Sequence, residues 1–184
     1  MRDLWVFGYG SLMWRPGFDF AERRRATLPG WRRRFCLKSI KYRGTPERPG
    51  LVLGLDADPA AECRGVAYRA APEAAEAVHA YLRERELVTY AYLETTQEIA
   101  LEEGRRVEAL CFVIDRDHAQ YAGPLTPEAQ AAVIAAAAGP MGSNADYLES
   151  TVDHLAEIGV ADPELDALRA LVRARRAEAA CPST

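Results

Sequence analysis

The order of its predicted elements constrains the fold of this chain more than any other feature. Segments with the character of strands, interrupted by one helical pattern, occupy residues 4–114, and helical patterns follow from residue 126. Strands grouped before helices favour an α+β domain, a mixed or antiparallel sheet with helices packed against it. Regular strand–helix alternation is missing, so a Rossmann fold is not expected. A length of 184 residues suits one such domain, which we expect over residues 1–184.

Short apolar or alternating segments, bounded by turn residues, predict the strands. These segments are 4–7, 31–40, 51–55, 65–68, 87–96 and 107–114. Turns are expected at 28–30, 56–59 and 102–105, and residues 43–50 are too rich in Gly and Pro for regular structure. Within 31–40, alternate side chains share one side of the predicted strand: Trp31, Arg33, Phe35, Leu37 and Ser39.

Helices are predicted from periodicity and from end signals. Residues 72–85 place apolar side chains at intervals of three and four, as on one face of a helix. Thr126 and Pro127 predict the N-cap and first turn of an alanine-rich helix that reaches about residue 138. Ser143 or Asn144 is expected to cap a third helix, and Asp162-Pro163 to begin the last. Residues 179–184 are expected to form a frayed tail.

The charge balance disfavours a nucleic-acid-binding protein. The chain has 23 Lys and Arg residues against 27 Asp and Glu residues, a formal net charge of −4, whereas such a binder carries a basic excess. Arginines do cluster at 23–25 and 32–34. We interpret both clusters as solvated faces near a turn, with attraction of an anionic substrate as the alternative.

Cysteine and histidine spacing gives no indication of a metal site or a disulfide framework. Cys36, Cys63, Cys111 and Cys181 are far apart, and His79, His118 and His154 are isolated. The first residues contain too few apolar side chains for a signal peptide, and no stretch could span a bilayer. We therefore expect a soluble, cytoplasmic protein in a reducing compartment.

The opening stretch, Leu4-Trp5-Val6-Phe7-Gly8-Tyr9-Gly10-Ser11-Leu12-Met13-Trp14, predicts a buried strand that ends in a tight loop. Gly8 and Gly10 can adopt positive φ and have no Cβ to keep a ligand from the backbone. Such a loop can direct successive N–H groups at a carboxylate or a developing oxyanion. The glycines alone are equally compatible with an ordinary turn after a strand.

Two glutamates at the end of the helix predicted over 72–85 are candidates for a general base. Glu84 and Glu86 lie near the negative end of the helix dipole, which raises a carboxyl pKa toward neutrality. The helical wheel does not choose between them, because they flank opposite edges of the apolar face. Arg85 would fall near the centre of that face, so either the helix has ended there or the arginine extends its charge to solvent. Neither a Ser-His-Asp pattern nor an activated cysteine can be argued.

The opening run Val6-Phe7-Gly8-Tyr9-Gly10-Ser11-Leu12-Met13-Trp14 resembles the start of the ChaC family, the glutathione-specific γ-glutamylcyclotransferases. The pair Arg85-Glu86 is similar to the place where the family carries its catalytic glutamate. Other similar stretches follow in the family's order and cover nearly the whole chain: residues 43–46 with 49–50, 65–69, 121–124 and 139–148.

The resemblance implies a cyclotransferase-type β-barrel with flanking helices, and cleavage of glutathione to 5-oxoproline and cysteinylglycine. It implies Glu86 as the general acid and base, with Glu84 as a bystander. Substrate-binding residues would be Val6, Phe7, Gly8, Tyr9, Gly10, Ser11 and Leu12, together with Arg43, Tyr121, Asn144 and Tyr147. Core packing or helix capping is an equally good explanation for the last four. Neither a metal nor an organic cofactor is needed.

Two alternatives remain open at this point. One is a cyclotransferase for other γ-glutamyl amino acids or γ-glutamylamines. The other is a non-catalytic module that binds a γ-glutamyl metabolite. The sequence makes no prediction of the oligomeric state.

Overall fold

The computed structural model describes residues 3–89 and 91–180. Its chain divides into two compact units, Met1–Arg33 with Gly54–Ala119 and Arg34–Leu53 with Gln120–Thr184. Each unit is described by itself below, and the predicted single domain stays a prediction.

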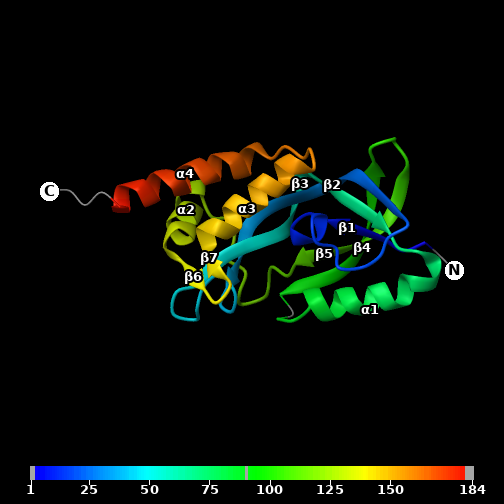
Figure 1. The fold of residues 1–184 in the computed structure, drawn as a ribbon, viewed down its shortest axis with the longest axis horizontal. Helices are drawn as coiled ribbons and strands as arrows, with labels where there is room; N and C mark the ends of the chain where they lie inside the picture. The colour runs from blue at the N-terminus through cyan, green and yellow to red at the C-terminus, as the bar shows by residue number, and fades with distance from the viewer. Residues whose placement is uncertain (1–2, 90, 181–184) are drawn as a thin grey trace. The chain divides into compact units, whose positions relative to one another are not determined.

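The first unit holds most of a closed barrel, whose strands follow the order β1-β3-β2-β4-β5 (Figure 1). These strands are β1 (Trp5–Gly8), β2 (Glu22–Ser39), β3 (Gly50–Arg69), β4 (Tyr92–Leu101) and β5 (Arg106–Ile114). β1 pairs antiparallel with β3, from Trp5↔Arg69 to Gly8↔Val66, and parallel with β5 at Trp5↔Ala109. β4 and β5 form an antiparallel hairpin. The barrel is therefore mixed, which confirms the predicted fold class.

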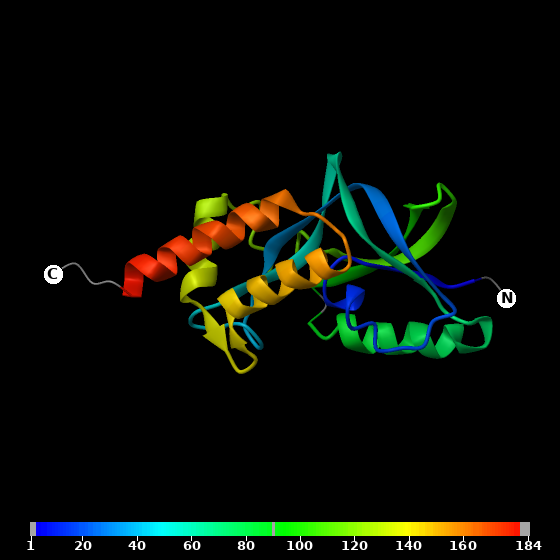
Figure 2. The same cartoon turned by 45° about the horizontal axis from the view of Figure 1, so that its top comes forward.

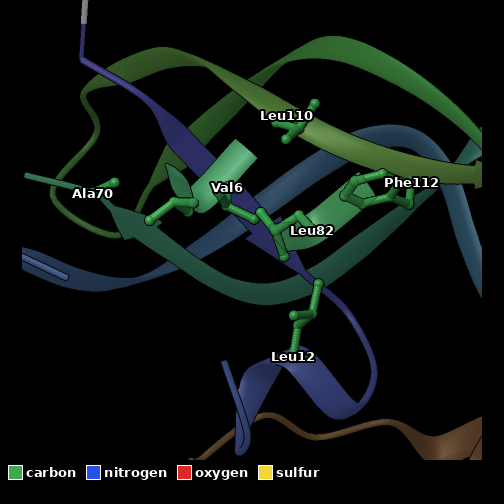
Figure 3. Close-up of a cluster of buried hydrophobic side chains, with 7 residues drawn as sticks. Val6, Leu12, Ala70, Leu82, Leu110 and Phe112 are labelled. Carbon is green, nitrogen blue, oxygen red and sulfur yellow. The ribbon is translucent and has the colours of Figure 1, made fainter. Parts of the chain in front are cut away.

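Helix α1 (Ala75–Glu86) packs on this barrel through a cluster of buried apolar side chains. It follows a short 3-10 turn, η2 (Pro72–Ala74), so the helix predicted over 72–85 is confirmed. Figure 3 shows Leu82 of α1 among Val6 of β1 and Phe112 of β5, and Leu82 is 0% exposed. This packing fixes the helix whose last residue is Glu86.

The second unit contains three helices and a small hairpin. These elements are α2 (Pro127–Ala136), β6 (Ala138–Gly139), β7 (Gly142–Ser143), α3 (Asn144–Glu157) and α4 (Pro163–Ala180). Thr126 caps α2 and Ser143 caps α3, each by accepting a backbone N–H, as the sequence predicted. α4 contacts both α2 and α3, and it runs beside α3 (Figure 2). The predicted tail lies outside the described residues from position 181 on, and Ala180 still belongs to α4.

Two predicted turns are wrong, because both lie inside long strands. β3 continues through residues 56–59, where the side chain of Asp56 is fully buried and pairs with Arg116 across 2.7 Å instead of forming a turn. β2 begins at Glu22 and continues through Pro29 and Gly30, since residues 26 and 27 already pair with β4. Gly30 absorbs the bend with a φ of +79°.

The predicted strand at 87–96 is also placed too early. α1 extends to Glu86, and β4 begins at Tyr92. The strand predicted at 107–114 is confirmed as β5. Within the described residues, no helix combines the length and the apolar character needed to cross a membrane.

Candidate active site

The loop after β1 turns so tightly that a side chain at Gly8 would be crowded. A Cβ on Gly8 would lie 3.1 Å from Cβ of Leu12 and 3.2 Å from the backbone N of Met13. Residues 11–13 form a 3-10 turn, η1 (Ser11–Met13), in which Met13 donates its N–H to the carbonyl of Gly10. Neither glycine uses the positive φ that glycine can adopt: φ of Gly10 is −132°, and Gly8 has no positive φ. Close approach, rather than left-handed backbone, explains the glycine at position 8.

Successive N–H groups of this loop remain available to a ligand. Within residues 3–89 and 91–180, we find no acceptor for the N–H groups of Gly10, Ser11 and Leu12. Buried or partly buried backbone donors normally have partners, so such a row is a feature that requires an explanation. An anionic oxygen is the ligand that suits adjacent N–H groups at the start of a helical turn.

Two buried side chains hold the carbonyl groups of the same loop. Arg33 is 4% exposed and donates from Nε to the carbonyl of Tyr9 at 2.5 Å, and it also bonds the carbonyl of Arg64. Tyr68 donates its hydroxyl to the carbonyl of Met13 at 2.5 Å. The C=O and N–H of one trans peptide point in opposite directions. Anchoring the Tyr9 carbonyl therefore directs the Gly10 N–H away from Arg33.

The interpretation of the arginine cluster at 32–34 as a solvated face is thus wrong for Arg33. The alternation predicted for this segment contained the signal, because Arg33 shares a side with Phe35, Leu37 and Ser39, and all four are buried. A charged residue in phase with a buried face indicates a buried charge that has partners.

Burial separates the two candidate glutamates. Glu84 is exposed, whereas the side chain of Glu86 is only 19% exposed at the last position of α1. Burial raises the pKa of Glu86, and the positive charge and hydrogen bond of Arg85 lower it by less. The raised pKa agrees with the prediction, but its largest cause is desolvation rather than the helix dipole.

Arg85 connects Glu86 to the loop that follows β1. Its Nε lies 3.1 Å from Oε1 of Glu86, and its Nη2 donates to the hydroxyl of Ser11 at 3.1 Å. Its Nη1 donates to the carbonyls of Arg15 at 2.7 Å and Pro16 at 3.1 Å. The helix has therefore not ended at position 85, and the arginine turns toward the loop. The structure brings together the loop at 8–16 and Glu86.

Gly17 completes this contact between loop and helix. Its φ is +78°, and a Cβ there would overlap the hydroxyl of Tyr81. Tyr81 in turn accepts a hydrogen bond from Arg85 at 3.1 Å. The loop can lie this close to α1 because residue 17 has no side chain.

The predicted contacts of Val6 and Phe7 with substrate stay predictions. Both side chains are 0% exposed, and Val6 belongs to the apolar cluster under α1 (Figure 3). Their positions are explained by packing.

The other predicted site residues lie in the second unit and have contacts of their own. Asn144 is fully buried and bonds both the N–H and the carbonyl of Leu51, at 2.6 and 2.7 Å. Arg43 lies over the ring of Tyr147, 5.3 Å from its centroid. Tyr121 forms an isolated bridge with Leu37. Substrate binding by Arg43, Tyr121, Asn144 and Tyr147 stays a prediction.

The thiol of Cys111 is a poor nucleophile. Burial, with a further contribution from Cys63, raises the pKa of Cys111 to about 12, so Cys111 is protonated at neutral pH. Cys36, Cys63 and Cys111 are buried and form no disulfide among the described residues, and Cys181 lies outside these residues. Over the part of the chain that is described, no three His, Cys, Asp or Glu residues come together as a metal site would need.

A largely buried carboxylate that Arg85 links to a loop with available N–H groups can move a proton and stabilise a negative oxygen. Comparison with known proteins identifies the family of the chain. The family model of the ChaC-like proteins matches residues 4–175. The chain belongs to the ChaC-like family.

Its relatives share one kind of activity in their names. The ChaC-like chain is 41% identical over 175 residues to the glutathione-specific gamma-glutamylcyclotransferase of Escherichia coli. The aligned residues cover 95% of this chain and 75% of the relative. It is 34% identical over 158 residues to glutathione-specific gamma-glutamylcyclotransferase 1 of Homo sapiens, covering 84% and 70% of the two chains. The crystal structure of the yeast gamma-glutamyl cyclotransferase specific to glutathione superposes with a TM-score of 0.85 at 28% identity, covering 96% and 98%.

Proposed function

We propose that this chain cleaves glutathione by intramolecular cyclisation, releasing 5-oxoproline and cysteinylglycine, with Glu86 as the general acid and base. Family membership and the names of its relatives support the substrate and the type of reaction. One observation of the molecule carries the proposal: the buried carboxylate of Glu86 is joined through Arg85 to a loop with N–H groups that have no acceptor among the described residues.

The chemistry requires few protein groups, because the nucleophile belongs to the substrate. In a γ-glutamyl amide the α-amine can reach the δ-carbonyl carbon and close a five-membered ring. Reaction within one molecule already supplies much of the reduction in barrier. The protein has to bind the substrate in a folded conformation, remove a proton and stabilise the oxyanion.

Glu86 performs the proton transfers in this mechanism. Its carboxylate takes a proton from the α-ammonium group, and the freed amine attacks the δ-carbonyl carbon to form the new C–N bond. The tetrahedral intermediate then collapses, the bond to the cysteinyl nitrogen breaks, and protonated Glu86 gives its proton to that nitrogen. No water is consumed and no group is oxidised or reduced. A carboxyl group with a raised pKa suits both halves of this cycle.

The loop supplies the anion-binding part of the mechanism. The N–H groups of Gly10, Ser11 and Leu12 hold the glutamyl end of the substrate, either at its α-carboxylate or at the oxygen that becomes negative during attack. Loss of one donor to an oxyanion costs about 10²–10³ in rate. The backbone supplies these donors, so the fold of the loop matters more than its side chains.

A reducing, cytosolic location fits this activity and is part of the proposal. Among the described residues, Cys36, Cys63 and Cys111 form no disulfide. A reducing compartment keeps such thiols, and glutathione itself, in the reduced form.

Release of 5-oxoproline from reduced glutathione tests the proposal directly. The assay compares the natural chain with Glu86→Gln, and Glu84→Gln serves as a matched control because Glu84 is exposed on the same helix turn. We expect turnover in the natural chain and in Glu84→Gln, and a loss of at least about 10²–10⁴ in Glu86→Gln. Retained activity in a folded Glu86→Gln variant would refute the role of Glu86.

Parallel assays with γ-glutamylalanine and with binding alone separate the remaining possibilities. Release of 5-oxoproline from γ-glutamylalanine at a comparable rate would identify a broader cyclotransferase. Binding of glutathione without any product would identify a non-catalytic binding module.

A further inference from the structure

We infer that Arg85 is a positioning residue that holds the Glu86 carboxylate and the loop at 8–16 in one fixed arrangement for the reaction. The inference rests on the proposed function of Glu86 and extends it to a residue that does not itself transfer a proton. It assigns to Arg85 the relative placement of the base and of the anion-binding N–H groups.

The first step is the geometry of the guanidinium group. Arginine presents N–H donors in a rigid planar fork, and here every nitrogen of that fork has an acceptor. Nε contacts Glu86, Nη2 contacts the hydroxyl of Ser11, and Nη1 contacts the loop carbonyls of residues 15 and 16. One rigid group therefore relates the carboxylate to three points on the loop.

The second step is the location of Arg85 on a fixed helix. α1 is anchored on the barrel by Val78 and Leu82, both buried in the apolar cluster. Arg85 lies one turn after Leu82, and its side chain is only 21% exposed. A guanidinium that starts from an anchored helix can impose its geometry on a loop, whereas one on a free surface cannot.

The third step is that the loop depends on this contact. The N–H groups of Gly10 to Leu12 have no acceptor in the described part of the chain, so only their neighbours set the direction in which they point. Arg33 holds the carbonyl of Tyr9 on one side of these residues, and Arg85 holds Ser11 and the carbonyl of Arg15 on the other. A displacement of about 1 Å in such a site can cost about 10² in rate.

Arg85→Lys is the informative substitution. It keeps the positive charge but replaces the planar guanidinium by a single ammonium, which cannot contact Glu86, Ser11 and the loop carbonyls with the same geometry. Arg85→Gln removes both the guanidinium geometry and the positive charge. Arg83 is the matched control, because it lies on the same helix, is exposed and forms an ion pair with Glu94 at 3.0 Å.

The measurements are kcat and KM for glutathione across pH, with thermal unfolding as a check on folding. We expect Arg85→Lys and Arg85→Gln to lower kcat by about 10–10², with a smaller change in KM, and Arg83→Gln to match the natural chain. Arg85→Gln should also move the acidic limb of the pH–rate profile to higher pH. Arg85 lowers the pKa of Glu86, so without Arg85 the effect of burial, which raises this pKa, is no longer opposed. In a folded protein, a purely structural role would leave this limb in place.

The charged and titratable groups around Glu86 make the pH readout specific. Arg85 is the charged group that contacts Glu86, and Tyr81 reaches it only through Arg85. Glu84 and the side chain of Arg15 are exposed, and the β1 and β5 residues in the cluster under α1 are apolar. Glu94 of β4 also faces α1, where it is hydrogen-bonded to His79 and Arg83 and not to Glu86. A shift of the acidic limb therefore reports the loss of Arg85.

Amide hydrogen exchange over residues 8–17 provides a readout that does not need turnover. We expect faster exchange in Arg85→Gln and unchanged exchange in Arg83→Gln. Unchanged exchange together with kcat within about twofold of the natural chain would overturn the inference. If the natural chain releases no 5-oxoproline but exchange in the loop still responds to Arg85, the proposed function fails and the placement of the loop by Arg85 stands.

Discussion

Replacing Asn144 by alanine tests whether this side chain supports the backbone or binds substrate. Its amide oxygen accepts the N–H of Leu51 at 2.6 Å, and its amide nitrogen donates to the carbonyl of the same residue at 2.7 Å. Asn144 is 0% exposed and Leu51 is 2% exposed. Both polar groups of Leu51 at this position therefore depend on one buried side chain.

The expected cost follows from those two hydrogen bonds. Alanine leaves a buried N–H and a buried C=O without their partner, at about 1–3 kcal/mol for each group. A water molecule that enters the space left by the amide recovers part of this energy. We therefore expect the free energy of unfolding to fall by about 2–4 kcal/mol.

Urea-induced unfolding, followed by circular dichroism, measures this loss. Asn144→Asp keeps the acceptor for the Leu51 N–H but buries a carboxylate and sets one of its oxygens against the Leu51 carbonyl, so it should be no more stable than Asn144→Ala. Glu157→Ala, at an exposed position on the same helix, should stay within about 0.5 kcal/mol of the natural chain.

The affinity for glutathione, measured in a Glu86→Gln background, separates the two roles of Asn144. If Asn144 supports the backbone, the folded fraction of the alanine variant binds glutathione with the same Kd as its parent. Unfolding within about 0.5 kcal/mol of the parent, combined with a Kd weakened tenfold or more, would refute this reasoning and establish Asn144 as a binding residue.

Three further outcomes follow from the first unit. Burial raises the pKa of Glu86 in the folded state, so the contribution of this group to stability is fully present below its unfolded pKa and is lost as pH rises through its folded pKa. Glu86→Gln should therefore unfold at a higher urea concentration than the natural chain at about pH 8 and at the same concentration below about pH 4. A lower urea midpoint for Glu86→Gln at about pH 8 would contradict this. Leu82→Ala should lower the free energy of unfolding by about 2–5 kcal/mol, and Leu93→Ala, at a half-exposed position, by less than about 0.5 kcal/mol, as measured in the same urea titration. Gly65→Ala places a Cβ against the carbonyl oxygen of Gly8, which is backbone and cannot move aside, so thermal unfolding should show a loss of about 1–3 kcal/mol, and an unchanged melting temperature would disprove this close approach.

Elements with local signals could be predicted from the sequence. The periodicity of residues 72–85 identified α1, and the caps at Thr126 and Ser143 identified the starts of α2 and α3. Such signals act between residues a few positions apart, so the sequence contains all of their information.

The two long strands could not be predicted in the same way. Asp56 and Pro59 favour a turn locally, but Asp56 pairs with Arg116, which is 60 residues further along the chain. At Pro29 and Gly30, β2 continues because its neighbouring residues already pair with β4. In both places a partner distant in sequence overrides the local preference.

The supporting roles of two arginines in the site were missed for a different physical reason. The resemblance singled out Glu86 and the opening loop, whereas Arg33 and Arg85 act mainly on the carbonyl groups of Tyr9, Arg15 and other loop residues. Every residue has a carbonyl, so a bond to the backbone leaves no mark on the identity of its acceptor. The sequence signals were the alternation that includes Arg33 and the position of Arg85 near the centre of an apolar helix face.

Two opposing effects on the pKa of Glu86 explain why the general base lies next to an arginine. Burial favours the protonated carboxyl group, whereas the positive charge of Arg85 favours the carboxylate form, which accepts a proton. Arg85 restores part of the ionised form, and the same guanidinium holds the loop that receives the negative charge of the substrate. A change at position 85 therefore alters both the protonation of the base and the position of the anion-binding groups. This coupling predicts that Arg85→Lys, which keeps the charge, loses activity through geometry alone. The acidic limb of the pH–rate profile should therefore shift less in Arg85→Lys than in Arg85→Gln, relative to the natural chain.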